Sequence, residues 1–128
     1  MDTLPHELRQ GVEEFNRAYF FEAHETLEDL WRGTSGPLRL FYQGLIQLAV
    51  ALYHLSNGNR RGALNLLSKA LDKLAAYQPV CQSIDVDALC RDACSWLDRV
   101  RQAGQGELRV DPEQLPRIRW VVSDRHSA

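Results

Sequence analysis

Residues 37–55 read PLRLFYQGLIQLAVALYHL and form the most apolar stretch of the chain. A helix that is apolar on nearly all sides is typical of the centre of a helical bundle. Three polar side chains in this stretch, Gln43, Gln47 and His54, are spaced by four and seven residues, so they share one face of a helix. Gly44 indicates that a neighbouring helix comes close, and we expect it to be the preceding one. The stretch therefore predicts a central helix with one polar stripe.

The residues just before it, HETLEDLW at positions 24–31, carry a matching stripe. On a helix that turns by about 100° per residue, His24, Glu28 and Trp31 lie within about 60° of one another. A histidine and a carboxylate thus lie in the middle of the face that should be buried, and charged residues are rarely fully buried unless they are paired. Because buried polar groups need hydrogen-bond partners, we expect the two polar stripes to face each other.

The two stretches together resemble a known family through an ordered set of residues. The set comprises Phe15-Asn16, Phe21-Glu22-Ala23-His24-Glu25, Glu28, Trp31 and Gln43-Gly44-Leu45-Ile46-Gln47-Leu48-Ala49. It resembles DUF309, a bacterial and archaeal domain of unknown function marked by an HxxxExxW motif, over about residues 12–71. The resemblance implies an all-helical fold, and it implies no reaction because the family has none assigned.

The composition is that of one ordinary globular domain: 128 residues, 45% hydrophobic and 25% charged. A net charge of −2 argues against a nucleic-acid partner or an anionic membrane surface. No apolar run reaches the roughly 20 residues of a membrane span, and the N-terminus lacks a signal pattern. We therefore expect a cytoplasmic protein. Its odd number of cysteines, three, predicts buried thiols rather than disulfides.

The apolar periodicity outside residues 37–55 predicts further helices. They cover about residues 4–16, 19–32, 60–77 and 85–103, with Thr3 capping the first and Asn16 ending it. Residues 107–128 contain two prolines and predict an extended tail. This tail is partly docked by Ile118 and Trp120, or is mobile, or lies against a partner subunit. The predicted fold is an all-α single-domain bundle of about five helices, with a core over about residues 4–103 and an extended C-terminal tail. The small size and the tail leave a homodimer open.

The candidate site is a buried polar pocket between the second and third helices. We predict that it is lined by His24, Glu28, Trp31, Gln43, Gln47 and His54. In the first interpretation this cluster is structural, because a buried polar network can fix the pairing of two helices.

In the second interpretation the cluster holds a divalent metal. His24 and Glu28 present a nitrogen and an oxygen in one direction, and His54 is a candidate third ligand. Two histidines and one carboxylate suit zinc, or iron with open positions, and helical bundles build metal sites in this way. A metal-dependent hydrolase would follow, with Glu25 or Glu28 as the base that acts on the bound water.

In the third interpretation the pocket binds a small polar ligand or performs metal-free acid–base catalysis through Glu28. Trp31, Tyr42 and Tyr53 would then frame the ligand. A nucleic-acid interface is the least favoured class, since it would require scattered arginines such as Arg39 and Arg60 to gather into one patch. The sequence best supports a small cytoplasmic domain in which this pocket is structural, or in which a ligand or a protein partner binds through the pocket or beside it. A metal-dependent hydrolase that uses His24, Glu28 and His54 is the alternative.

Overall fold

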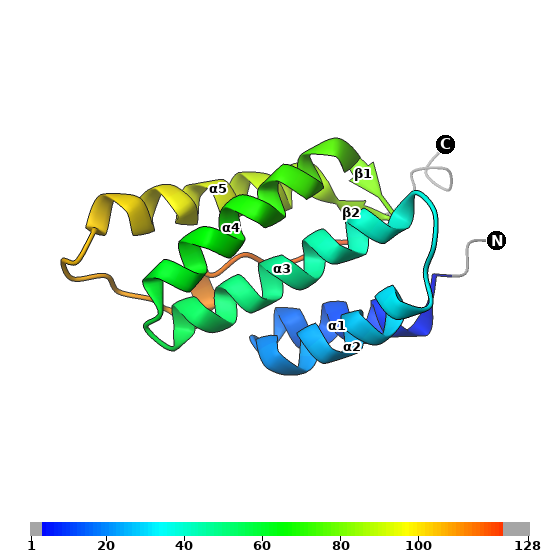
Figure 1. Cartoon of the computed structure of the whole chain (residues 1–128), viewed down its shortest axis with the longest axis horizontal. Coiled ribbons are helices and arrows are strands. Elements are labelled where there is room, and N and C mark those ends of the chain that lie inside the picture. Colours follow the sequence, from blue (N-terminus) through cyan, green and yellow to red (C-terminus); the bar gives the residue numbers. More distant parts are fainter. Residues whose placement is uncertain (1–3, 122–128) are drawn as a thin grey trace.

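Five α-helices dominate the computed structural model, which describes residues 4–121 (Figure 1). Their bounds are α1 His6–Asn16, α2 Phe20–Arg32, α3 Leu38–Ser56, α4 Arg60–Leu74 and α5 Val86–Ala103. The all-α fold and the number of helices predicted from the apolar periodicity are confirmed. The predicted cap at Thr3 lies outside the described residues.

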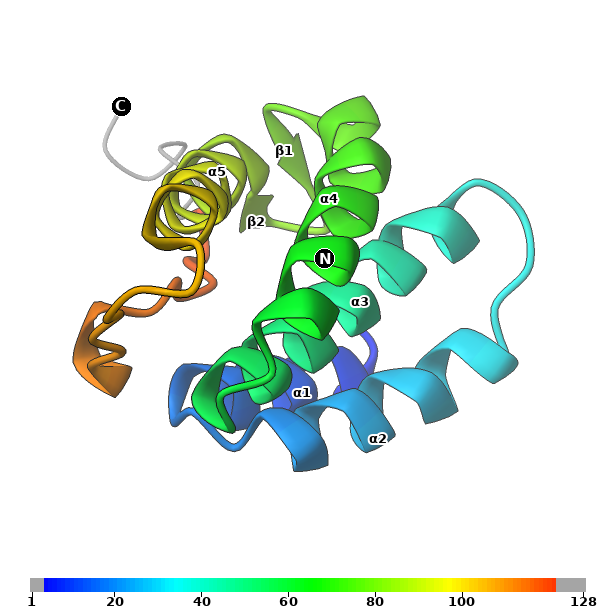
Figure 2. The ribbon, with the colours of Figure 1, turned by 60° about the vertical axis from the view of Figure 1, so that its left-hand side comes forward.

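The most apolar helix, α3, is the centre of the fold. It packs against α2 on one side and against α4 on the other, while α1 contacts α2 and α5 contacts α4. Figure 2 shows α1 and α2 as a pair on one side of α3, with α4 and α5 on the other. More than half of the 19 residues of α3 are buried. The apolar pattern on nearly all sides of residues 37–55 is therefore explained, as expected, by the position of this helix at the centre of the bundle.

Two glycines mark close contacts between helices. A Cβ atom added to Gly11 of α1 would lie 2.7 Å from side-chain carbons of Leu27 in α2. A Cβ atom added to Gly44 would lie 3.0 Å from Leu74 Cδ2 and 3.2 Å from Lys73 Cβ, both of α4. The prediction that Gly44 approaches the preceding helix was wrong, because this glycine lies on the side of α3 that faces α4.

Side-chain caps define the starts of the last two helices. Asn59 Oδ1 accepts a hydrogen bond from the Gly62 N–H at 3.0 Å, and Asp85 Oδ1 accepts one from the Ala88 N–H at 2.9 Å. Such bonds satisfy backbone donors that have no partner within the first turn of a helix. The predicted fourth helix is shorter than expected, because α4 ends at Leu74 and a 3₁₀ turn, η1 (Ala75–Tyr77), follows it.

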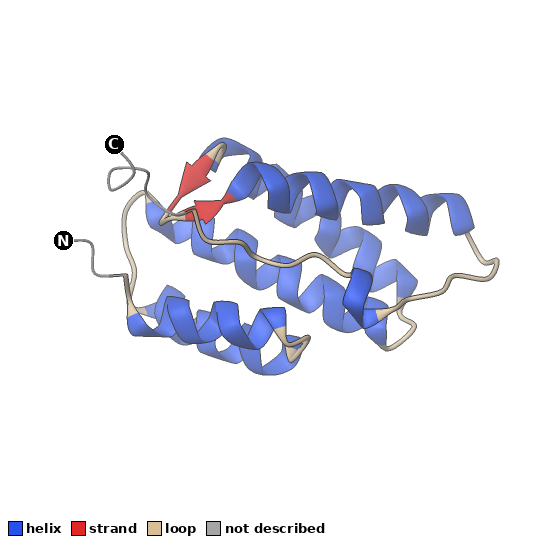
Figure 3. Cartoon of the chain, turned by 180° about the vertical axis from the view of Figure 1, so that it is seen from behind, coloured by secondary structure: helices blue, strands red, loops and turns tan. Residues whose placement is uncertain are grey.

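A short antiparallel hairpin precedes α5. Its strands are β1 (Val80–Cys81) and β2 (Ile84–Asp85), drawn in red in Figure 3. Gln82 and Ser83 make the turn with positive φ angles of 51° and 61°. The sequence did not predict this hairpin, since strands of two residues are too short to show an alternating apolar pattern.

The tail runs back from the end of α5 between α5 and α1 (Figure 3). It includes a 3₁₀ turn, η2 (Pro112–Gln114), and buries Leu115 and Ile118. Trp96 Nε1 of α5 donates to Gln114 O at 3.0 Å, and Trp120 pairs with Ile84 of β2 as an isolated bridge. The predicted docking by Ile118 is confirmed over the described residues, whereas Trp120 docks through its backbone and leaves its ring partly exposed.

None of the helices described over residues 4–121 is both long enough and apolar enough to cross a bilayer.

Candidate functional site

Glu28 lies near the surface rather than in a buried pocket. Its side chain is 36% exposed, and Glu28 Oε2 is 3.8 Å from His24 Nε2. Its other oxygen accepts a hydrogen bond from Arg32 Nη2 at 3.1 Å. The expectation of a buried carboxylate was therefore wrong. Arg32, one helical turn further on, neutralises Glu28 at the rim of α2, so no partner from α3 is required.

Trp31 forms part of the connection between α2 and α3. The Arg39 guanidinium lies 3.9 Å from the centroid of the indole ring, a cation–π arrangement. Arg39 Nη1 also donates to Trp31 O at 3.0 Å and to Thr34 O at 2.7 Å. Arg39 thus satisfies the carbonyl groups of Trp31, in the last turn of α2, and of Thr34, just after that helix.

The two glutamines of α3 do not join the predicted network. Gln43 and Gln47 are half-buried, and over residues 4–121 no hydrogen bond links either of them to His24 or Glu28. In the same described part of the chain, Gln47 Oε1 and Trp31 Nε1 are buried atoms without a hydrogen-bond partner. The expected continuous His, Glu and Gln cluster is therefore divided into separate contacts.

His54 is oriented by the cap of α4. Its Nδ1 is 3.3 Å from Asn59 Nδ2. Asn59 Oδ1 already accepts from the Gly62 N–H, so the amide group presents its NH₂ to the imidazole. We assign His54 Nδ1 as the acceptor on this basis, which leaves the proton of the neutral ring on Nε2.

His24 and His54 come together on the wall of an apolar cavity between α2 and α3. The cavity has a volume of about 130 Å³, close to the roughly 150 Å³ of an engineered protein cavity that binds benzene. Its lining consists of Phe20, Phe21, His24, Val50, Tyr53 and His54. The polar spacing of the sequence predicted both histidines as site residues. Phe20, Phe21 and Val50 were not predicted, because apolar residues at helical spacing are equally expected in a core.

Half-exposed aromatic rings form the rim of this cavity. Phe21 is 46% exposed and Tyr53 is 40% exposed, and their ring centroids are 5.7 Å apart. The His24 ring lies 5.6 Å from Phe21, measured between centroids. The aromatic surface of the site therefore extends beyond the cavity itself.

Two acidic residues follow cavity residues in the sequence of α2. Glu22 and Glu25 directly follow Phe21 and His24 in α2, and both are exposed. Over residues 4–121, neither carboxylate has an ion-pair partner within 4.0 Å. A cationic partner would therefore meet uncompensated acidic groups along this edge.

The candidate metal ligands do not converge. Over the described residues, no three His, Cys, Asp or Glu side chains lie together in a way that would hold a metal ion. His24 Nδ1 is 3.3 Å from Phe21 O, and its Nε2 is 3.8 Å from Glu28 Oε2, so the nearest polar groups to the ring both belong to α2. Glu25 does not line the cavity. Over the described residues, the arrangement does not support a three-ligand metal centre at His24, Glu28 and His54.

The shifted pKa values belong to groups outside the cavity. Burial raises the pKa of Tyr42, and a hydrogen bond from Gln82 Nε2 at 2.8 Å partly opposes the shift. Burial also raises the pKa of the Cys81 and Cys90 thiols. Tyr42 is a core residue and not part of a ligand frame, whereas Tyr53 does line the cavity. Cys90 is buried as predicted, whereas Cys94 is exposed.

The first half of the chain matches a known family. Residues 8–66 match the model of DUF309, a domain of unknown function. This confirms the resemblance predicted from the HxxxExxW motif and its companion residues. The matched region includes α2, α3 and the apolar cavity, and it ends before α5 and the tail.

Two similar proteins carry no assigned function in their names. The uncharacterized protein YpuF of Bacillus subtilis (strain 168) is 36% identical over 69 residues, which are 53% of this chain and 40% of YpuF. An uncharacterized protein of Aquifex aeolicus (strain VF5) is 32% identical over 69 residues, which are 53% of this chain and 21% of that protein. The similarity thus covers less than half the length of either relative.

Proposed function

We propose that this chain is a protein-binding domain that holds its partner by one apolar side chain inserted between α2 and α3. The observation that carries the proposal is the apolar cavity of about 130 Å³ surrounded by half-exposed aromatic rings. Aromatic residues around a small pocket are typical of the centre of a protein–protein interface.

The size of the cavity favours a side chain over a free ligand. Pockets for drug-sized ligands typically measure about 300–1,000 Å³. A volume of about 130 Å³ accommodates a single aromatic ring or a branched aliphatic group. So small a free molecule has few atoms with which to offset the entropy lost on binding. A side chain that belongs to a larger partner gains further contacts with the exposed rings of Phe21 and Tyr53.

The surroundings of the cavity indicate the chemistry of the partner. Glu22 and Glu25 directly follow two cavity residues, Phe21 and His24, in α2; both are exposed and have no ion-pair partner among the described residues. His54 Nε2–H is a donor that the cap of α4 does not use. We therefore expect an apolar anchor residue next to lysine or arginine, since complementary charge favours association and selects the orientation.

The motif residues have a supporting role in this proposal. Glu28 pairs with Arg32, and Trp31 stacks on Arg39, so both stabilise the end of α2 and its connection to α3. In this proposal the motif residues still have the structural role of positioning α2 and α3, while the partner binds in the cavity between these helices.

A peptide-display selection against the full chain tests the proposal. Val50→Trp would fill the cavity, while Leu40→Trp adds the same group to an exposed position of α3 that does not line it. We expect the selected peptides to share an apolar residue flanked by basic ones. They should bind the Leu40→Trp variant like wild type and lose about tenfold or more in affinity for the Val50→Trp variant.

The role of charge is tested with the same peptides. Replacing Glu22 and Glu25 by glutamine should weaken binding at low salt and flatten its salt dependence. Circular dichroism establishes that each variant is folded. Peptides that bind the Val50→Trp variant as well as they bind wild type, or that share no apolar residue, would contradict the proposal.

A further inference from the structure

We infer that a second, polar cavity between α5 and the tail binds a small zwitterion, such as a free amino acid or a dipeptide. This cavity measures about 600 Å³ and lies apart from the α2–α3 pocket. Apart from Asn16, its lining belongs to α5 and the tail, outside the part of the chain that matches DUF309. The inference does not depend on the proposed protein-binding function.

The tail segment that forms one wall is held firmly. Asn16 Oδ1 accepts from the Ile118 N–H at 2.7 Å, and Asn16 Nδ2 donates to Ile118 O at 2.8 Å. The Asp85 N–H donates to Arg119 O at 2.9 Å, and the Val121 N–H donates to Ser83 O at 2.7 Å. A wall fixed in this way loses little conformational freedom when a ligand binds.

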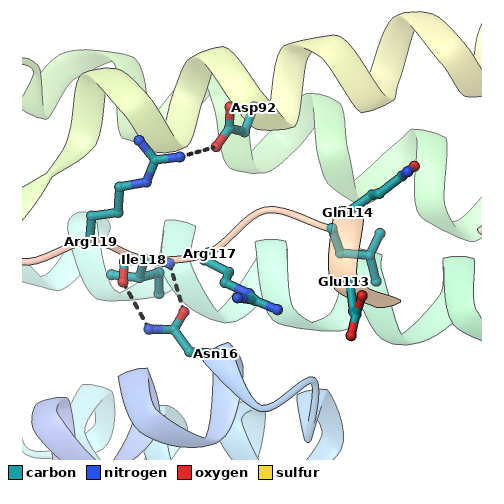
Figure 4. Close-up of a pocket in the computed structure, with 8 residues that line it drawn as sticks. Asn16, Asp92, Glu113, Gln114, Arg117, Ile118 and Arg119 are labelled. Carbon is teal, nitrogen blue, oxygen red and sulfur yellow. Dashed lines mark hydrogen bonds and ion pairs between the residues drawn. The ribbon is translucent and has the colours of Figure 1, made fainter. Parts of the chain in front are cut away.

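Two arginines project from the same side of this segment. Ile118 points into the core and is 2% exposed. In an extended chain, successive side chains point to opposite sides, so Arg117 and Arg119 share the side away from the core. Figure 4 shows both of them at the cavity, where Arg119 approaches Asp92 of α5 and Arg117 extends toward the side of Glu113.

The charges of the cavity are balanced in number but poorly paired. Arg119 Nη2 lies 3.8 Å from Asp92 Oδ2, a long ion pair. Over residues 4–121, Arg117 and Glu113 have no ion-pair partner within 4.0 Å. Two guanidinium groups and two carboxylates, all at least partly exposed to solvent, thus line one cavity, and one group of each sign has no ion-pair partner among the described residues.

This combination selects a ligand with both charges. A simple anion would lie next to Asp92 and Glu113, and a simple cation would lie next to Arg117 and Arg119. A zwitterion places its carboxylate against a guanidinium group, which can form two parallel hydrogen bonds to it, and its ammonium group against a carboxylate. A volume of about 600 Å³ is in the range of small-molecule sites.

Titration of the full chain with L-alanyl-L-alanine tests the inference. Two blocked forms serve as matched ligands: N-acetyl-alanyl-alanine lacks the ammonium group, and alanyl-alanine amide lacks the carboxylate. Calorimetry gives the affinities, and backbone amide NMR signals of Arg117, Ile118 and Arg119 locate the site. We expect saturable binding of the free dipeptide and at least about tenfold weaker binding of each blocked form.

Neutral variants assign the two charges. Arg117→Gln should bind the free dipeptide and its amide equally, and Glu113→Gln should bind the free and acetylated forms equally. Arg101→Gln, at an exposed position of α5 outside the cavity, should behave like wild type. The absence of saturable shifts at millimolar concentrations, or equal binding of all three ligands by wild type, would overturn the inference. Unchanged dipeptide binding by the Val50→Trp variant would separate this site from the α2–α3 cavity.

Discussion

At the scale of single residues, Asn16 connects parts of the chain that are far apart in sequence. It ends α1, and its amide group forms two hydrogen bonds with the backbone of Ile118, 102 residues away. Asn16 was expected to end the first helix, as it does, but the positive φ that often follows a helix end is found two residues later, at Ala18. The side chain of Asn16 is therefore used for tertiary structure, which no local pattern reveals.

Replacing Asn16 by alanine should destabilise the protein by about 1–3 kcal/mol. The substitution removes both hydrogen bonds and leaves part-buried backbone groups of Ile118 without a partner. Urea unfolding measures the change, and hydrogen exchange should show faster exchange of the Ile118 amide. Asn65→Ala, at an exposed position of α4, is the control and should stay within about 0.5 kcal/mol of wild type. Equal stability of the two variants would contradict the assigned role of Asn16.

The candidate site shows how far single residues can be interpreted from sequence. Helical spacing correctly placed His24 and His54 on facing sides of α2 and α3. Helical spacing indicates the direction in which a side chain points, but it does not indicate how deeply the side chain is buried. Glu28 was therefore expected in the interior, whereas it lies near the surface beside Arg32. The apolar members of the cavity gave no signal, because apolar residues at helical spacing are also what a core requires.

At the scale of elements, the helices were predictable and their connections were only partly so. Each helix carries an apolar stripe long enough to identify it, and glycine, proline and asparagine mark most of the breaks. The β1–β2 hairpin escaped prediction because it pairs only four residues. The neighbour of Gly44 was assigned to the wrong helix, since a glycine indicates that another backbone is close without indicating which one.

At the start of α4, the side chain of Asn59 caps the helix and also contacts His54, and two substitutions separate these contributions to stability. Asn59→Ala removes the cap of Gly62 and the contact with His54, and should cost about 1 kcal/mol. Asn59→Asp keeps an oxygen for the cap and adds negative charge at a helix N-terminus, which is favourable. We expect the aspartate variant to equal wild type in urea unfolding. If both variants lose the same stability, the contact with His54, and not the cap, makes the contribution.

At the scale of the whole molecule, the tail links the two helix pairs that lie on opposite sides of α3. α1 and α2 lie on one side of α3, and α4 and α5 lie on the other. The tail contacts α5 through Trp96 and α1 through Asn16, and it buries Leu115 and Ile118. This arrangement favours one cooperative unit. The single domain expected from the chain length therefore stays a prediction with a defined test.

Unfolding followed separately in the two halves provides that test. A variant that keeps only Trp31 reports on α2, and a variant that keeps only Trp96 reports on α5; phenylalanine replaces the other tryptophans. In each variant, fluorescence and circular dichroism should give the same urea midpoint, as a two-state transition requires.

Ile118→Ala, introduced into both variants, removes a buried tail side chain and should cost about 2–5 kcal/mol. Because Trp31 is distant from the tail in sequence, the decisive result is whether its transition shifts as much as that of Trp96. Equal shifts would establish one cooperative domain, and a shift confined to the Trp96 signal would show that the two halves unfold independently.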